Sequence, residues 1–304
     1  MVDYSQLTSE YIESLLSHTQ SLFNHVYYFT QDLSHPPGRS HRGAAVNTVD
    51  IREKREDFLR ELANTACNWV YSKSRYQQIL MRELERREGD APNAASQLKA
   101  QTKRKFRKGH PQGQFGELLL FNFLQHFFHA VPLLRKMPLT TTSGVERYGA
   151  DAIHYALSGS TNVLYLGEAK SYTSKYGFKR AFHESLSSIL KSYDDLDNEL
   201  DLYVYDDFIE EPLNDLARDF KDGCLDNIRH ELVSVVAYHE NNSINGDSED
   251  IIKQEIRRTV KARYASVDGD AYDNIDERLP DRMHYVIFPI WQFDEFITKF
   301  EDSL

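Results

Sequence analysis

Apolar and polar positions alternate along the second half of the chain in a way that predicts both helices and strands. The segment from Phe115 to His129 is apolar on nearly every side, which is typical of a buried helix. Shorter apolar runs, bounded by turn residues, have the length and spacing of strands. We expect helices at 115–129, 177–196 and 248–266, and strands at 133–142, 148–157, 162–170, 230–240 and 284–291. A hairpin followed by crossover helices implies an α/β fold with a mixed sheet flanked by helices on both faces.

The first 110 residues show a different, largely helical pattern. Residues 4–30 predict one or two helices, and residues 50–88 carry apolar side chains near helical spacing between charged ones. The segment 35–45 predicts a loop, because Pro-Pro and Gly-Arg-Ser interrupt any period. Glycine and proline recur just after this part of the chain and predict a boundary. We therefore expect a helical N-terminal domain over residues 1–110 and a second domain over residues 111–304.

The composition is that of a folded protein from a reducing compartment. Hydrophobic residues make up 40% of the 304 positions and charged residues 27%, which excludes a wholly disordered chain. Two cysteines, Cys67 and Cys224, are too few for a disulfide framework or a cysteine-rich zinc module, and they favour the cytoplasm. The N-terminus lacks a signal-peptide pattern, and the most apolar stretch, 118–134, is too polar and broken to span a bilayer. We expect a cytoplasmic protein that does not associate with membranes.

Charge is distributed unevenly along the chain, whose net charge is −11. Residues 99–108 contain six Lys or Arg and no acid, whereas residues 193–222 contain 12 acids and two bases. The basic run would contact nucleic-acid phosphates or form a solvated helix face, and both interpretations stay open. The acidic segment would be a solvated insertion, a docking surface for a basic partner, or a surface that repels DNA. Candidate nucleic-acid contacts are Lys103, Arg104, Lys105, Arg107, Lys108, Lys175, Lys179 and Arg180.

Three charged residues in apolar strands carry the candidate chemistry. Asp151 lies in the strand at 148–157, and Glu168 and Lys170 lie near the end of the next strand. Because strand side chains alternate, Glu168 and Lys170 share one face, and Asp151 meets Glu168 if the strands are neighbours. Two adjacent carboxylates repel each other, and a divalent cation relieves that repulsion. A donor set of oxygens alone favours Mg²⁺ or Mn²⁺, and Lys170 beside such a metal could orient a water for phosphodiester hydrolysis.

Other polar residues near this group allow more than one interpretation. Glu117 lies at the rim of the apolar helix and would supply a further metal ligand, or would merely complement the helix dipole. A solvated hairpin end also remains open for the Glu168–Lys170 motif. His126 and His129 stand three residues apart, but no third zinc ligand accompanies them, which favours core or helix-end histidines. The sequence has no GxxxxGK[ST] phosphate loop, so a nucleotide-driven motor would have to be another chain.

The order of these motifs resembles the PD-(D/E)xK nuclease superfamily. The order is a helix with Glu117, a strand with Asp151, a hairpin, and then Glu168-Ala169-Lys170, with Gly-Ala-Asp in place of Pro-Asp. More narrowly, GQFGE, YGAD, LGEAK and a late strand with Phe-Pro make residues 112–300 similar to the C-terminal nuclease domain of HamA and AbpA proteins, to which residues 1–110 contribute little. The resemblance implies a restriction-endonuclease-like core and Mg²⁺ ligands from Asp151, Glu168 and the Ala169 carbonyl.

The resemblance also implies a biological setting. HamA is the nuclease subunit of the Hachiman anti-phage defence system, whose other subunit, HamB, is a superfamily-2 helicase. DNA cleavage that is restrained and released by a helicase partner is therefore the expected activity. Two alternatives remain open: a free-standing restriction or repair endonuclease, and a non-catalytic nucleic-acid-binding subunit on a nuclease fold.

Overall fold

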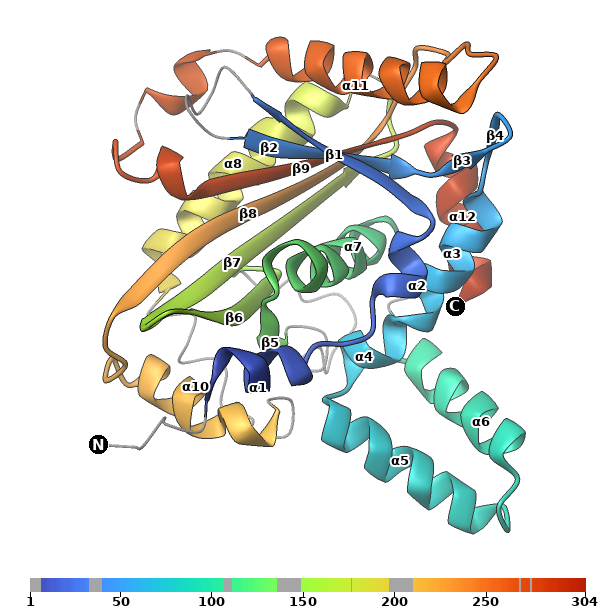
Figure 1. Cartoon of the computed structure of the whole chain (residues 1–304), viewed down its shortest axis with the longest axis vertical. Helices are drawn as coiled ribbons and strands as arrows, with labels where there is room; N and C mark the ends of the chain where they lie inside the picture. The colour runs from blue at the N-terminus through green and yellow to red at the C-terminus, as the bar shows by residue number, and fades with distance from the viewer. Residues whose placement is uncertain are drawn as a thin grey trace.

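A seven-stranded sheet forms the centre of the molecule in the computed structural model (Figure 1). The structure describes residues 7–32, 40–106, 111–135, 149–175, 177–196, 210–267, 269–273 and 275–304. The strands are β1 (Val26–Asp32), β2 (Ser40–Val46), β5 (Val131–Arg135), β6 (Ala152–Ser158), β7 (Thr161–Tyr172), β8 (Ile228–His239) and β9 (Met283–Ile290). Their order in the sheet is β1-β2-β9-β8-β7-β6-β5. A separate two-stranded ribbon joins β3 (Thr48–Val49) to β4 (Arg52–Glu53).

Both strand orientations occur, so the prediction of a mixed sheet is confirmed. The strands β2, β9, β8 and β7 run parallel to their neighbours within this group, whereas β1 with β2, β5 with β6, and β6 with β7 are antiparallel. The middle of β8 is buried from Glu231 to Tyr238, as expected for a parallel strand that is covered on both faces.

Helices cover both faces of the sheet. The helices are α1 (Ser9–Ser14), α2 (Gln20–Phe23), α3 (Arg55–Asn64), α4 (Ala66–Val70), α5 (Lys73–Arg86), α6 (Ala91–Lys103), α7 (Pro111–Phe128), α8 (Phe178–Asp194), α10 (Asn214–Lys221), α11 (Glu249–Ala265) and α12 (Phe293–Ser303). Figure 1 shows α7 in front of the sheet and α8 behind it, while α5 and α6 form an antiparallel pair that extends away from the sheet. Among the described helices, none combines the length and the apolar run that crossing a membrane requires.

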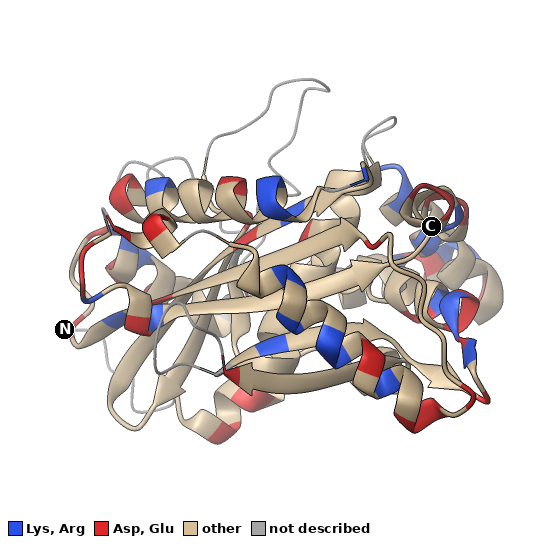
Figure 2. Cartoon of the chain, turned by 90° about the horizontal axis from the view of Figure 1, so that it is seen from above, with Lys and Arg blue, Asp and Glu red and all other residues tan. Residues whose placement is uncertain are grey.

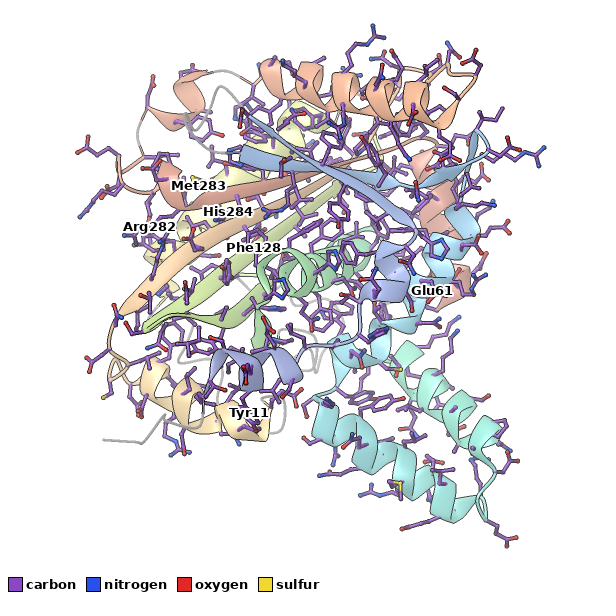
Figure 3. All side chains as sticks on the ribbon, viewed as in Figure 1. Tyr11, Glu61, Phe128, Arg282, Met283 and His284 are labelled. Atoms are coloured by element: carbon purple, nitrogen blue, oxygen red, sulfur yellow. The ribbon has the colours of Figure 1, made fainter. Side chains whose placement is uncertain are left out.

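The C-terminal half of α7 packs toward the amino ends of the parallel strands. Phe128 lies 5.0 Å from the ring of His284 on β9, measured between centroids (Figure 3). His284 in turn forms a 2.8 Å contact with the buried Glu231 of β8, which also pairs with Arg229 at 2.5 Å. This end of the sheet therefore contains a polar cluster under α7, and His284 lies about 20 Å along β9 from the carboxyl end of that strand.

The first 110 residues are not all helical, and the predictions for 4–30 and 35–45 are wrong where they meet β1 and β2. The buried residues of β1, Val26 and Phe29, are three positions apart, which imitates helical spacing. In β2, Gly43 is the residue that faces Phe29 across the strand pair. A Cβ at Gly43 would lie 2.2 Å from Phe29 Cζ, so glycine is needed to accommodate the ring.

The position of the expected domain boundary does not coincide with a break in the fold. β2 pairs with β9, which joins the N-terminal segment to the main sheet. Leu62 and Leu98 belong to the same apolar cluster as Phe115 and Phe288.

The expected helices at α7, α8 and α11 and the expected strands β6 to β9 are confirmed. Two described helices, α10 and α12, were not predicted.

A buried carboxylate after β8 is neutralised by an arginine of α11. The side chain of Glu240 is fully buried, and it accepts hydrogen bonds from Arg263 Nε at 2.8 Å and Nη2 at 2.5 Å. It also accepts from the Tyr238 hydroxyl at 3.1 Å and the Asn242 amide at 2.8 Å. Burial alone would raise the pKa of Glu240, but these hydrogen bonds and the Arg263 charge outweigh burial and lower the pKa below its usual value.

We expect Arg263→Met to lower the free energy of unfolding by about 3 kcal/mol, because it leaves a buried carboxylate without its counter-charge. Adding Glu240→Gln to this variant should recover part of the loss. As a matched control, Arg258→Met removes the exposed partner of Glu255 on the same helix and should cost no more than about 0.5 kcal/mol. Urea unfolding at pH 7 measures all three values, and equal losses in the two arginine variants would contradict the prediction.

The same ion pair predicts a dependence on pH. Because folding lowers the pKa of Glu240, its carboxylate stabilises the fold above the unfolded-state pKa of about 4.3. That stabilisation is lost as the pH falls through the folded-state pKa. The difference in unfolding free energy between wild type and Glu240→Gln should therefore narrow below about pH 4. A difference that stays constant between pH 7 and pH 3 would contradict this assignment.

Candidate active site

The hairpin of β6 and β7 brings Asp151 beside Glu168. Ala152 pairs with Gly167, and Asp151 and Glu168 are the next residues outward on the two strands. The Asp151 amide donates to the Gly167 carbonyl at 2.8 Å, and the Ala169 amide donates to Asp151 Oδ2 at 3.0 Å. The carboxylate of Asp151 is thus fixed across the peptide that links Glu168 to Ala169.

Lys170 completes the group on the same face of β7. Its Nζ lies 2.7 Å from Glu168 Oε1, and the two side chains are 27% and 5% exposed. An ion pair offsets part of the free energy that burying the carboxylate costs. Figure 2 shows the central strands almost entirely in the colour of uncharged residues, with Lys, Arg, Asp and Glu concentrated on helices and connections. An acid–base pair within a central strand is a feature that Glu168 and Lys170 share with Arg229 and Glu231, which are paired near the amino end of β8.

The group lies toward the carboxyl end of the parallel strands. Glu168 and Lys170 pair in register with Ser234 and Val236 of β8, and the chain leaves β7 two residues beyond Lys170 for the crossover to α8. Open α/β sheets bind ligands outside the carboxyl ends of their strands. The candidate site therefore lies at the edge of the sheet where folds of this class bind their ligands.

Two glycines allow α7 to approach β7 closely at this point. A Cβ at Gly116 would lie 2.4 Å from Ser171 Oγ, and a Cβ at Gly167 would lie 2.9 Å from Leu120 Cδ2. The side-chain amide of Gln112 also donates to the Ser171 carbonyl. The glycines of the GQFGE and LGEAK motifs therefore have a packing role: they seat the start of α7 against the strand that carries Glu168 and Lys170.

Glu117 follows Gly116 on α7, on the side of the sheet that α7 covers. The described residues contain no group of three or more His, Cys, Asp or Glu side chains that could hold a metal ion together. Glu117 therefore does not complete a three-carboxylate cluster with Asp151 and Glu168, and its catalytic role stays a prediction. The remaining oxygen donors, two carboxylates and the Ala169 carbonyl, fit Mg²⁺, which binds through one or two carboxylates and keeps several waters.

The two histidines of α7 are accounted for by packing. His126 stacks on Phe23 with ring centroids 3.5 Å apart, and burial lowers the pKa of His126 to about 4. His129 lies at the helix end, 3.8 Å from Glu13. The interpretation as core and helix-end histidines is confirmed.

The candidate nucleic-acid contacts fall into two exposed groups. Lys103 ends α6, and Arg104 and Lys105 follow it, while Arg107 and Lys108 lie outside the described residues. Lys175 precedes α8, and Lys179 and Arg180 belong to its first turn. All six described side chains are exposed, and their binding to nucleic acid stays a prediction.

Residues 197–209 of the acidic segment 193–222 lie outside the described part of the chain. One acid of this segment has a structural role that the sequence did not suggest. Glu210 is 4% exposed and accepts a 2.7 Å hydrogen bond from the Lys73 amide at the start of α5. This residue stabilises a helix N-terminus that is 137 positions away in sequence.

Sequence reasoning also missed two residues that adjoin Lys170. Tyr172 is on the same face of β7, two positions after Lys170, and its hydroxyl donates to Glu184 of α8. Glu184 also accepts from Arg180 Nε at 2.7 Å. The signals that could have revealed them were the two-residue period of a strand and the four-residue spacing of a helix pair.

The comparison with protein families covers nearly the whole fold. A family model named HamA matches residues 20–304, which span from α2 through all seven strands of the sheet to α12. No curated protein matches the chain. The resemblance therefore extends well beyond residues 112–300, and it includes the N-terminal strands that the sequence did not predict. The chain belongs to the HamA family.

Proposed function

We propose that this HamA-family chain is a metal-dependent nuclease that hydrolyses DNA phosphodiesters in Hachiman anti-phage defence. Family membership associates the chain with that defence system. The observation that carries the nuclease proposal is the hairpin geometry: Asp151 lies beside Glu168, and Lys170 is paired with Glu168 at the carboxyl end of β7. The resemblance to PD-(D/E)xK nucleases supports the same assignment.

In this proposal, Asp151, Glu168 and the Ala169 carbonyl hold Mg²⁺ or Mn²⁺. When bound, the metal would acidify a water and offset charge on the phosphate. Asp151 contributes a carboxylate that the Ala169 amide already holds in place, so little conformational freedom is lost on binding. Lys170 contributes an ammonium donor to the attacking water, and Glu117 is proposed as a fourth member of the site.

DNA binding is assigned to the exposed basic residues on α6 and at the start of α8. The end of α6 carries the first group, which consists of Lys103, Arg104 and Lys105, and this helix contains no acid after its N-cap residue Asp90. Lys175, Lys179 and Arg180 follow the catalytic strand directly. Phosphate contacts of this kind supply most of the non-specific affinity for DNA and make it sensitive to salt.

Control of the nuclease is assigned to a superfamily-2 helicase or another ATPase, like HamB. A cytoplasmic nuclease without sequence specificity would damage its own cell, and this sequence contains no phosphate-loop motif with which to gate itself. Cleavage that changes when a helicase subunit is added would support this arrangement. Cleavage that is independent of any partner would favour a free-standing endonuclease, and binding without cleavage would favour a non-catalytic subunit.

We expect Glu168→Ala and Lys170→Ala each to lower the rate of DNA cleavage by at least about 100-fold. Glu168→Ala should leave thermal stability unchanged or raise it, because it removes the buried charge. Lys170→Ala should lower thermal stability, because the buried Glu168 carboxylate loses its counter-charge. Plasmid nicking with Mg²⁺ and thermal unfolding measure the two effects. Lys299→Ala on α12, which removes a lysine paired with Glu295, is the matched control and should cleave like wild type. Wild-type nicking by the two site variants would rule out this active site.

Activity should require Mg²⁺ or Mn²⁺ and should disappear in the presence of a chelator, because every proposed ligand atom is oxygen. Ca²⁺ should compete for the same ligands and support cleavage poorly. Titration of each metal into chelated protein, followed by the nicking assay, tests this expectation. Undiminished activity with chelator present would mean that the chemistry lies elsewhere.

A further inference from the structure

Beside the proposed site, Tyr172, Glu184 and Arg180 form a connected cluster between β7 and α8. The Tyr172 hydroxyl donates to Glu184 Oε2, and Arg180 Nε donates to Glu184 Oε1 at 2.7 Å. The Arg180 guanidinium carbon also lies 5.3 Å from the centroid of the Tyr172 ring. One carboxylate and one ring therefore fix the orientation of an arginine whose side chain is 73% exposed.

The backbone holds this cluster close to Lys170. Strand alternation puts Tyr172 on the same face as Lys170, which is the face that α8 covers. The Gly177 amide donates to the Ser174 carbonyl at 3.1 Å, and a Cβ at Gly177 would lie 2.9 Å from Tyr172 Cβ. Gly177 therefore lies directly against Tyr172, and the first turn of α8 begins beside it.

Electrostatic interactions connect the cluster to Lys170. Hydrogen bonds from Tyr172 and then from Arg180 lower the pKa of Glu184, and the Lys170 charge lowers it further, so this carboxylate stays ionised. Burial, together with the hydrogen bond to Glu184, raises the pKa of Tyr172, which therefore stays a neutral donor. The cluster keeps one protonation state across the physiological range.

Helix stability does not explain why a basic residue stands at this position. Arg180 is the third residue of α8, whose first turn contains no acid. Positive charge in the first turn is repelled by the amino end of the helix dipole. An exposed pair four residues apart contributes only about 0.3–0.5 kcal/mol, and the order with the base first is the less favourable one.

We infer that Glu184 and Tyr172 are positioning residues that hold Arg180 so that its outer guanidinium nitrogens bind a DNA phosphate adjacent to the one cleaved beside Lys170. Arg180 uses Nε to contact Glu184, and its side chain is 73% exposed, so the outer part of the guanidinium is accessible to a ligand. A guanidinium fork matches the geometry of phosphate oxygens, and holding it in place lowers the entropy lost on binding. This inference rests on the proposed nuclease function, because it assigns a substrate contact to the same site.

The decisive variant is Glu184→Gln, because two explanations predict opposite signs. If Glu184 is only a counter-charge, removing one negative charge near DNA strengthens binding. If Glu184 positions Arg180, the same change weakens binding, since the arginine loses its fixed orientation. Tyr172→Phe removes the hydroxyl that holds Glu184 but keeps the ring, so it should weaken binding to a smaller degree.

The affinity of the full chain for a fluorescent DNA duplex, measured by anisotropy in Ca²⁺ at several salt concentrations, tests the inference without cleavage. Arg180→Ala should weaken binding by about tenfold and reduce the slope of log affinity against log salt by about one. Arg180→Lys should restore the salt slope but only part of the affinity. Glu184→Gln should weaken binding about threefold or more through loss of the fixed geometry. Arg258→Ala and Glu255→Gln remove a similar exposed pair on α11 and should leave the affinity unchanged.

Cleavage kinetics in Mg²⁺ separate this inference from the proposed function. In variants that retain wild-type thermal stability, Arg180→Ala should raise KM with kcat changed by less than about twofold, as expected for a binding contact. Unchanged affinity in Arg180→Ala, or stronger binding in Glu184→Gln, overturns the inference even if wild type cleaves DNA. If wild type binds DNA but does not cleave it, the proposed nuclease function fails, while the expected affinity changes would still support a phosphate-binding cluster.

Discussion

The position of β7 in the sheet is the constraint on which the site depends. β7 pairs antiparallel with β6 on one side and parallel with β8 on the other. The antiparallel register brings Asp151 beside Glu168, and the parallel register carries Glu168 and Lys170 toward the edge where ligands bind in this class of fold. A shift of one residue in the β6–β7 pairing would move Asp151 to the other face and separate the carboxylates. Gly116 and Gly167 help to fix this arrangement, because they allow α7 to press on β7 without a steric clash.

The local pattern of apolar and polar residues predicted those elements whose buried face is visible in their own sequence. The apolar run of α7 and the two-residue period of β6 and β7 were sufficient, because these elements lie close together in sequence. β1 and β2 could not be predicted in the same way. Their place is decided by pairing with β9, more than 200 residues later, and by the fit of Phe29 over Gly43. Because of that contact, Gly43 has a packing role within a strand, whereas sequence-based rules usually interpret glycine as a sign of a turn or loop.

The candidate site divides in a similar way between what sequence could and could not predict. Strand alternation was enough to put Glu168 and Lys170 on one face and to bring Asp151 alongside. The sequence could not predict that Glu117, on the opposite face, fails to join the two carboxylates in one cluster. It also could not predict that Glu210, within an acidic segment, is buried against the start of α5. Both outcomes depend on how distant elements pack, and neither residue carries a local signal of its partner.

The N-terminal third of the chain is part of the fold that supports the site. β2 lies directly beside β9, and Phe58 of α3 stacks on Phe288 of β9 at a centroid distance of 5.8 Å. Without residues before position 111, the edge of β9 would lose its partner strand, and the apolar face around Phe288 would lose its cover. The HamA family match begins at residue 20, just before β1, so it includes the N-terminal strands together with the rest of the sheet. Within the part of the chain that the structure describes, the paired helices α5 and α6 extend away from this shared core (Figure 1). Surface residues of α5 and α6 that bind a partner or nucleic acid can therefore differ between proteins without disturbing the sheet that holds Asp151, Glu168 and Lys170 in register.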